Sequence, residues 1–107
     1  MRVYIAGPIS LGDRVANIRQ AILAADLVLR AGHTPFVPHL DFLWELVVGD
    51  APYEGRMAYD HEWIKVCGAL IRLPGASSGA DREVVWAREL GIPVYFSVDD
   101  FLAAAHT

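Results

Sequence analysis

The segment LPGASSGADREVVWARELGIPV, residues 73–94, decides the fold of this chain. It continues the apolar run ALIRL (69–73), opens with a loop rich in glycine and serine, and becomes helical over residues 81–90. A glycine ends the helical pattern, and the apolar run IPVYF (92–96) follows it. A strand, a helix and a second strand in this order are typical of the right-handed crossover that joins parallel strands. The segment therefore predicts a parallel β-sheet.

The rest of the chain repeats this alternation of strands and helices. Further strands are expected at RVYIA (2–6) and TPFVP (34–38), and helices at residues 13–31, 40–48, 57–67 and 98–106. Short apolar runs that alternate with helical patterns form α/β layers. We predict one α/β domain over residues 1–107, a three-layer Rossmann- or flavodoxin-like sandwich around a parallel sheet of four to five strands.

Two of the predicted helices carry apolar stripes. In the helix at 13–31 Asp13 is the expected N-cap, and apolar residues at spacings of three and four are Val15, Ile18, Ile22, Ala25 and Leu29. In the helix at 57–67 the residues expected to face inward are Trp63, Ile64 and Cys67. A lone cysteine excludes an internal disulfide and is typical of a small buried hydrophobic residue.

Composition limits the partners that the chain can bind. The formal net charge is −4 and no basic stripe is present, which argues against a nucleic-acid polymer. A single nucleotide remains compatible, because backbone amides can hold its phosphate. No apolar run reaches the ~18–20 residues that a membrane span needs, and no secretory leader pattern opens the chain. We therefore expect a cytoplasmic protein with no membrane partner.

The apolar content predicts self-association. Of the 107 residues, 54% are hydrophobic, whereas a domain of this size buries only part of its apolar surface. The segment 40–48 is more apolar than so small a core requires. We expect a homodimer or a higher homo-oligomer.

Three segments should meet at one edge of the predicted sheet. GPIS (7–10) and PGASSGA (74–80) each follow a strand, and the helix that carries Tyr59 and Asp60 starts at the same edge because it runs antiparallel to the strand after it. Ligands of open parallel sheets bind beyond the carboxyl ends of the strands. This topology brings Asp60 close to Glu83.

A pair of carboxylates can cleave a glycosidic bond, one as nucleophile or base and the other as acid. Glu83 is expected in the first turn of its helix, where the helix dipole favours its ionised form. A nucleophilic carboxylate must be ionised, so the position suits this role. The alternative is structural, since glutamate is also common in first turns as a capping partner.

The loop before this helix can bind an anion. The hydroxyls of Ser77 and Ser78 and the amide of Gly79 stand where a helix N-terminus holds a phosphate. Ordinary N-capping by a serine is the alternative. The sequence contains neither GxGxxG nor GxxxxGK[ST], which excludes the usual dinucleotide and P-loop sites.

Other polar and aromatic residues leave two interpretations open. His39 and Asp41 are possible metal ligands, but without a second cluster a hydrogen-bonded pocket wall is favoured, and we expect no metal and no cofactor. Trp44, Tyr53 and Tyr59 can stack on a base or simply belong to the core or an interface.

Three stretches together resemble the nucleoside 2-deoxyribosyltransferase-like superfamily, which holds nucleoside deoxyribosyltransferases and 2′-deoxynucleoside 5′-phosphate N-hydrolases. They are VYIAGPIS (3–10), AGHTPFVP (31–38) and DHEWIKVCGALIRLPGASSGADREVVWARELGIPV (60–94). The likeness is greatest to an uncharacterised branch of short bacterial and phage proteins. The resemblance implies a small-molecule nucleoside or nucleotide as partner, and pockets built across subunits.

The resemblance also implies roles for single residues. Glu83 matches the glutamate that attacks the anomeric carbon and forms a glycosyl-enzyme intermediate. Asp60 matches the aspartate near the leaving base, and Tyr4 matches a tyrosine that orients the glutamate. Gly7 lies in the loop beside the sugar, where Ile9 is a further candidate contact.

Ser77 separates the two branches of the superfamily. The transferases tend to carry at this position an aspartate that binds a sugar hydroxyl, whereas a serine is similar to the N-hydrolases, where it helps to hold the phosphate. GPIS (7–10) lacks the arginine of the hydrolases' first loop, so Arg14 or Arg82 would take its place.

The resemblance and the paired carboxylates together favour an N-glycosidase that acts on (deoxy)nucleoside 5′-monophosphates through Glu83. A deoxyribosyltransferase that exchanges bases on nucleosides, or a non-catalytic nucleotide-binding protein, is the alternative.

Overall fold

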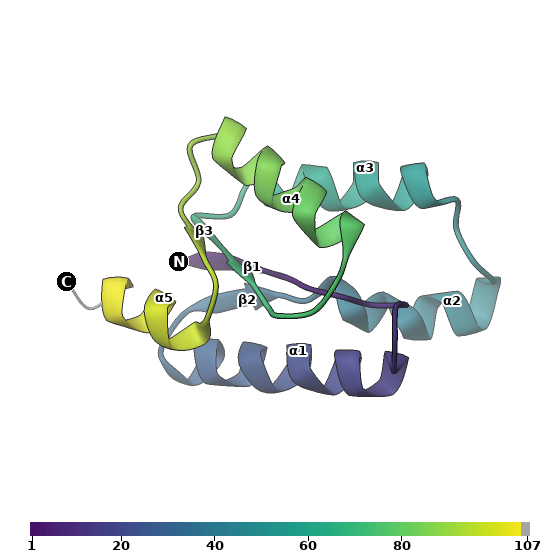
Figure 1. Cartoon of the computed structure of the whole chain (residues 1–107), viewed down its shortest axis with the longest axis horizontal. Coiled ribbons are helices and arrows are strands. Elements are labelled where there is room, and N and C mark those ends of the chain that lie inside the picture. The colour runs from purple at the N-terminus through teal and green to yellow at the C-terminus, as the bar shows by residue number, and fades with distance from the viewer. Residues whose placement is uncertain (106–107) are drawn as a thin grey trace.

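The computed structural model describes residues 1–105, which form a parallel sheet covered by helices on both faces (Figure 1). The strands are β1 (Arg2–Ala6), β2 (Thr34–Phe36), β3 (Ala69–Arg72) and β4 (Val94–Tyr95). The helices are α1 (Arg14–Arg30), α2 (Phe42–Val48), α3 (Tyr53–Ile64), α4 (Ser78–Glu89) and α5 (Val98–Ala105), with a 3₁₀ turn η1 (Pro38–Asp41) before α2. The sheet has four strands in the order β2-β1-β3-β4. This confirms the predicted α/β sandwich.

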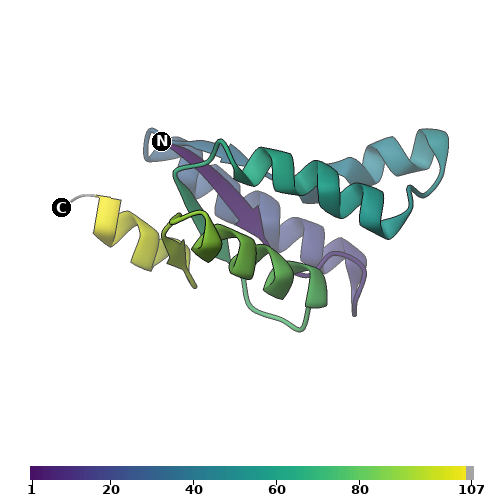
Figure 2. The same ribbon diagram turned by 90° about the horizontal axis from the view of Figure 1, so that it is seen from above.

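Each face of the sheet has its own apolar core. Val3 and Ile5 of β1 pack with α1 and α5 on one face, whereas Tyr4 and Ala6 pack with α3 and α4 on the other. Successive strand residues point to opposite faces, so a strand buried on both faces reads as a continuous apolar run. Figure 2 shows α3 and α4 side by side over their face of the sheet.

The buried face of α1 differs from the predicted stripe. Asp13 caps the helix as expected, accepting a hydrogen bond from the amide of Ala16. Of the predicted apolar stripe, however, only Ala25 is buried, and Val15 is 73% exposed. The residues that contact the sheet are Ala21, Ala24, Ala25 and Val28. Small side chains let the helix lie close to the strands, and the larger aliphatic residues then point outward.

Several element boundaries differ from the prediction at turn residues. β2 ends at Phe36 because Pro38 begins the turn η1, and β4 pairs with β3 only over Val94–Tyr95. α4 starts at Ser78, three residues before the predicted start, because Ser77 caps it. The predicted closing helix extended to His106, which lies outside the described residues.

α3 starts at Tyr53, directly after Pro52, and ends at Ile64. Ile64 and Cys67 are buried as expected, whereas Trp63 is 42% exposed and stacks on Phe36. None of the helices within residues 1–105 is long and apolar enough to cross a membrane.

Candidate active site

A cavity of about 370 Å³ opens at the carboxyl edge of the sheet. Its walls come from the loop after β1, the start of α1, one side of α2, the loop between α2 and α3, and the N-terminal parts of α3 and α4. Most of the predicted site residues line it, namely Gly7, Ile9, Asp60, Ser77, Ser78, Gly79 and Glu83. The structure therefore brings together segments that are far apart in the sequence.

Three buried side chains form the base of this site. Tyr4 is fully buried in β1, and its hydroxyl donates a hydrogen bond to a carboxylate oxygen of Glu83. Glu83 is 5% exposed and Asp60 is 3% exposed, and both line the cavity. Burial and the neighbouring carboxylates raise the pKa of the Tyr4 hydroxyl, so it remains a proton donor.

Burial controls the ionisation of the two carboxyl groups. Desolvation raises the pKa of Glu83 to about 8, although the Tyr4 hydrogen bond opposes this shift and the charge of Asp60 adds to it. Desolvation likewise raises the pKa of Asp60 to about 7. Near neutral pH the pair therefore retains a proton instead of carrying two negative charges.

The predicted placement of Glu83 was wrong in one respect. Because α4 begins at Ser78, Glu83 lies in the second turn of the helix and not in the first. The dipole effect falls off within the first turn, and the loss of water around a buried carboxylate outweighs it. Glu83 is thus held near its neutral form in the empty site and not in the ionised form expected from the helix start.

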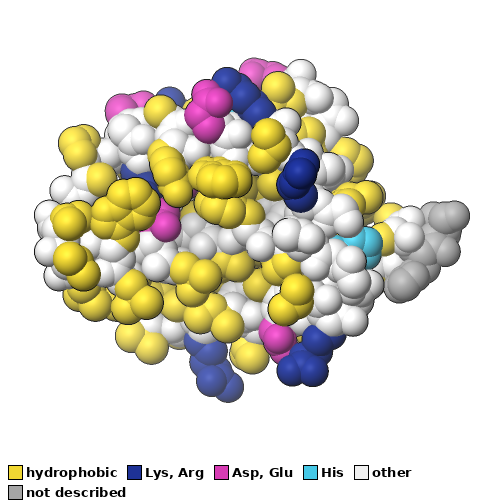
Figure 3. Space-filling view, turned by 180° about the vertical axis from the view of Figure 1, so that it is seen from behind, with side chains coloured by type: hydrophobic (Ala, Val, Ile, Leu, Met, Phe, Trp, Pro, Cys, Tyr) yellow, Lys and Arg dark blue, Asp and Glu magenta, His cyan; other side chains and the backbone are white. Residues whose placement is uncertain are grey.

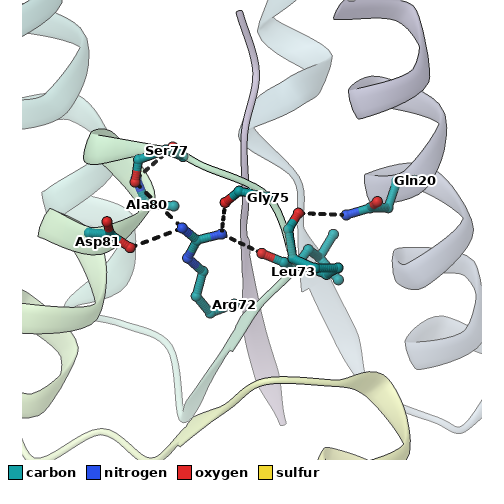
Figure 4. Close-up of polar contacts among 8 residues, drawn as sticks. Gln20, Arg72, Leu73, Gly75, Ser77, Ala80 and Asp81 are labelled. Carbon is teal, nitrogen blue, oxygen red and sulfur yellow. Dashed lines mark hydrogen bonds and ion pairs between the residues drawn. The ribbon is translucent and has the colours of Figure 1, made fainter. Parts of the chain in front are cut away.

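Arg72, at the end of β3, fixes the loop that leads to α4 (Figure 4). Its buried guanidinium donates to the carbonyl oxygens of Leu73 and Gly75, the latter at 2.9 Å, and pairs with Asp81 at 2.9 Å. Gly75 has a φ of +117°, and a Cβ there would lie 2.8 Å from the ring of Pro8. The loop is therefore closely packed and has one backbone shape.

Ser77 acts as the N-cap of α4 and also lines the cavity. Its Oγ accepts a hydrogen bond from the amide of Ala80 at 3.0 Å. The hydroxyl still has a proton to donate. The amides of Ser78 and Gly79 come before the first intrahelical bond, as at every helix N-terminus. N-capping by Ser77 is thus confirmed, and the binding of an anion by this loop stays a prediction.

The two arginines considered for the phosphate lie in different places. Arg14 lines the cavity, where it forms an ion pair with Glu45 and its guanidinium lies 4.5 Å from the ring centre of Phe42. Arg82 is not among the residues of the described chain that line the cavity. It pairs with both carboxylate oxygens of Glu54, at 2.9 and 3.0 Å.

His39 and Asp41 have separate hydrogen-bond partners. His39 is buried with its Nε2 3.1 Å from the carbonyl oxygen of Pro8, and burial lowers its pKa. A carbonyl only accepts, so Nε2 carries the proton. Asp41 pairs with Arg56 at 3.0 Å. Within residues 1–105 no three His, Cys, Asp or Glu side chains gather as a metal site would require.

Trp44 lies apart from the other predicted site residues. It is 50% exposed and contacts the ring of Tyr59 edge-on at 5.9 Å. The two rings line a separate depression of about 210 Å³, because α2 turns Trp44 toward α3 and away from the main cavity. Of the other candidate aromatic residues, Tyr53 does line the main cavity.

Sequence reasoning missed Arg56, which lines both the main cavity and the depression beside Trp44. The available signal was its place one helical turn before Asp60, since residues four apart share a helix face.

The chain is an α/β protein whose fold matches that of solved 2-deoxyribosyltransferases. The chain belongs to the family described as "Domain of unknown function (DUF7768)", whose model matches residues 1–97. No curated protein matches the sequence at a significant level.

Two solved structures share the fold at low sequence identity. The 2-deoxyribosyltransferase of Bacillus psychrosaccharolyticus has 20% identity and a TM-score of 0.62, over 88% of this chain and 69% of that one. The 2-desoxiribosyltransferase of Leishmania mexicana has 19% identity and a TM-score of 0.64, over 87% of this chain and 61% of that one. The chain thus spans less than two thirds of the Leishmania protein. These likenesses confirm the expected fold.

Proposed function

We propose that the chain is an N-glycosidase acting on (deoxy)nucleoside 5′-monophosphates, with Glu83 as nucleophile. The observation that carries this proposal is the pair of buried carboxyl groups, Glu83 and Asp60, facing one cavity with the Tyr4 hydroxyl on Glu83. Nucleophile and acid roles need neighbouring carboxyl groups of which one is ionised and the other protonated. A pair that retains one proton near neutral pH provides this combination when that proton lies on Asp60 and not on Glu83.

The proposed reaction has two steps. In the empty site the higher pKa of Glu83 keeps the shared proton there, so the reactive form arises when this proton passes to Asp60. From that form the ionised carboxylate of Glu83 forms a bond to C1′, the C1′–N bond breaks with its electrons going to the base, and Asp60 gives its proton to the departing base. Water then attacks C1′, the bond from C1′ to Glu83 breaks, and the ionised Asp60 takes the proton from water. Both side chains return to their starting forms. Tyr4 supports the first step because its hydrogen bond favours the ionised form of Glu83.

The 5′-phosphate would bind at the start of α4. The Ser77 hydroxyl and the amides of Ser78 and Gly79 are donors at a helix N-terminus, which favours anions. Arg14 adds a positive charge in the same cavity. It would exchange part of its ion pair with Glu45 for the phosphate.

A product assay tests this proposal against the alternatives. The protein is incubated with nucleosides and 5′-monophosphates, with and without an added free base, and products are separated by chromatography. Monophosphates are expected to release base about 10- to 100-fold faster than nucleosides, because hydrogen bonds to charged groups contribute about 1.5–3 kcal/mol. Arg14→Gln should remove most of this preference, whereas Arg82→Gln, outside the cavity, should not.

Other results would select another function. The fold of the solved 2-deoxyribosyltransferases favours base exchange as the second candidate, and a new nucleoside formed with the added base would support it. Equal turnover of nucleosides and monophosphates would contradict the nucleotide specificity. Binding without base release would support a non-catalytic nucleotide-binding protein.

We also propose that the chain forms a homodimer or higher homo-oligomer through α2. None of the residues of α2, all of which the structure describes, is buried. Leu43, Leu46 and Val47 are 66%, 66% and 84% exposed, and apolar side chains gather at this end of the molecule (Figure 3). Light scattering should give at least twice the mass of 11.8 kDa, and Val47→Glu should reduce it. A monomeric mass at micromolar concentration would contradict the proposal.

A further inference from the structure

We propose that Arg56 selects the nucleobase, favouring bases that present two adjacent hydrogen-bond acceptors, such as O6 and N7 of guanine or hypoxanthine or O2 and N3 of cytosine. This inference rests on the proposed function, because it assigns part of the same cavity to the base.

Arg56 stands where a base can be reached. It lies on α3, one turn before Asp60, and lines the cavity that Glu83 and Asp60 face. Glu83 reaches this cavity from α4, whereas Arg56 also faces Asp41 and Trp44 of the η1–α2 segment. A base bonded to C1′ departs away from the attacking carboxylate, toward the remaining walls. The depression beside Trp44 continues from Arg56 and leaves room for a ring system.

The guanidinium of Arg56 is held in one orientation. Its Nη1 donates to Asp41 at 3.0 Å, and the two side chains are only 19% and 20% exposed. The rings of Trp44 and Tyr59 lie 5.0 and 5.4 Å from its Cζ. A planar cation stacked on aromatic rings and tethered by a carboxylate loses little further freedom on binding a ligand. Such preorganisation favours selective recognition.

Arg56 also has donors to spare. Nε is enclosed by protein without a partner, so the terminal nitrogens are the ones a ligand can reach. Asp41 takes one N–H of Nη1, and no acceptor within residues 1–105 pairs with Nη2. An arginine that has its carboxylate partner on one side and free terminal N–H groups on the other can still bind a second acceptor group.

The chemistry of these donors discriminates between bases. A guanidinium only donates, so it matches an edge with two neighbouring acceptors, as in the arginine–guanine pair. Adenine has its N6 amino donor beside N7, and thymine and uracil have N3–H between their carbonyl groups. In each of these bases a donor would therefore face one of the N–H donors of Arg56. A good bidentate pair discriminates by about 1–3 kcal/mol, which corresponds to roughly 5- to 150-fold in affinity.

The test measures binding separately from turnover. In the Glu83→Gln background, calorimetry gives Kd values for dGMP, dIMP, dCMP, dAMP and dTMP. The first three are expected to bind at least about 5-fold more tightly than the last two. Arg56→Gln should remove this difference and improve dAMP relative to dGMP, because glutamine offers one donor and one acceptor and pairs with adenine. Arg82→Gln is the matched control and should leave the order unchanged, since Arg82 also lies over an aromatic ring with a carboxylate partner but outside the cavity.

The inference is overturned if the five nucleotides bind equally, or if Arg56→Gln weakens all of them by the same factor. If Arg56→Gln does not fold, Arg56→Lys is the second variant to test, because it keeps the positive charge but lacks the two parallel N–H donors of the guanidinium. It too should reduce the discrimination between bases. A protein that shows the base preference in binding but never releases base would contradict the proposed function and leave this inference standing. Base release with no preference among bases would support the proposed function and contradict this inference.

Discussion

Replacing Glu83 by glutamine is expected to lower base release from 5′-monophosphates by roughly 10³- to 10⁶-fold, the range seen when a covalent nucleophile is removed. The amide has nearly the same shape, so the cavity and its Tyr4 contact remain. Single-turnover chromatography of released base measures the loss. Glu89→Gln, an exposed glutamate at the end of the same helix, is the control and should retain full activity. Turnover by Glu83→Gln within about tenfold of the native rate would remove Glu83 from the mechanism.

The same substitution should stabilise the fold at alkaline pH. The pKa of Glu83 rises from the ordinary 4.5 to about 8 in the folded chain. Its contribution to stability is therefore fully present below about pH 4.5 and is lost as the pH rises through about 8, where the buried group must ionise. Glu83→Gln is expected to be about 2–4 kcal/mol more stable than the native chain at pH 9, with little difference at pH 5. Urea unfolding at the two pH values measures this, and an equal difference at both would contradict the buried, neutral state of Glu83.

The sequence was sufficient for the sheet and for the meeting of the two carboxyl groups. Four short apolar runs alternate with helical patterns, and in a parallel sheet the carboxyl ends of strands and the starts of the intervening helices must share an edge. That rule alone brought Asp60 near Glu83, and the structure places both on one cavity. Positions set by topology can be predicted without knowing any side-chain contact.

What depends on tertiary packing was not predictable. The prediction of the buried face of α1 was wrong because apolar residues at spacings of three and four occur on two sides of that helix. Only contact with the sheet determines that the side with Ala21 and Val28 is buried. The prediction that Glu83 is ionised was wrong because burial, which a sequence does not show, raises its pKa more than a position near a helix start lowers it. Arg56 gave no motif. Its importance comes from Asp41 and the rings that fix it.

Arg72 is a second residue whose importance comes from its tertiary contacts and not from a sequence motif. Arg72→Met is expected to lower the free energy of unfolding by about 3 kcal/mol or more. Arginine inside a buried strand looks misplaced in the sequence, yet this one is only 8% exposed and its donors satisfy the carbonyl groups of Leu73 and Gly75. Leaving a buried acceptor unpaired costs about 1–3 kcal/mol, and methionine leaves two. Urea unfolding measures the loss.

A substitution of Asp81, the exposed ion-pair partner of Arg72, distinguishes the effect of the ion pair from that of the hydrogen bonds to the loop carbonyl groups. Asp81 has 73% of its side chain exposed, and exposed ion pairs contribute about 0–1 kcal/mol. Asp81→Asn should therefore cost less than about 1 kcal/mol, and an equal loss in the two variants would show that the ion pair carries the effect. Arg72→Met should also raise the KM for 5′-monophosphates more than it lowers kcat, because the loop sets the start of α4 where the phosphate is proposed to bind. The Glu83 carboxylate is held by Tyr4, and the charge of Arg72 has only the smallest of the effects on its pKa. A variant that loses stability but keeps its KM would show that the donors at the start of α4 hold their positions without the Arg72 contacts.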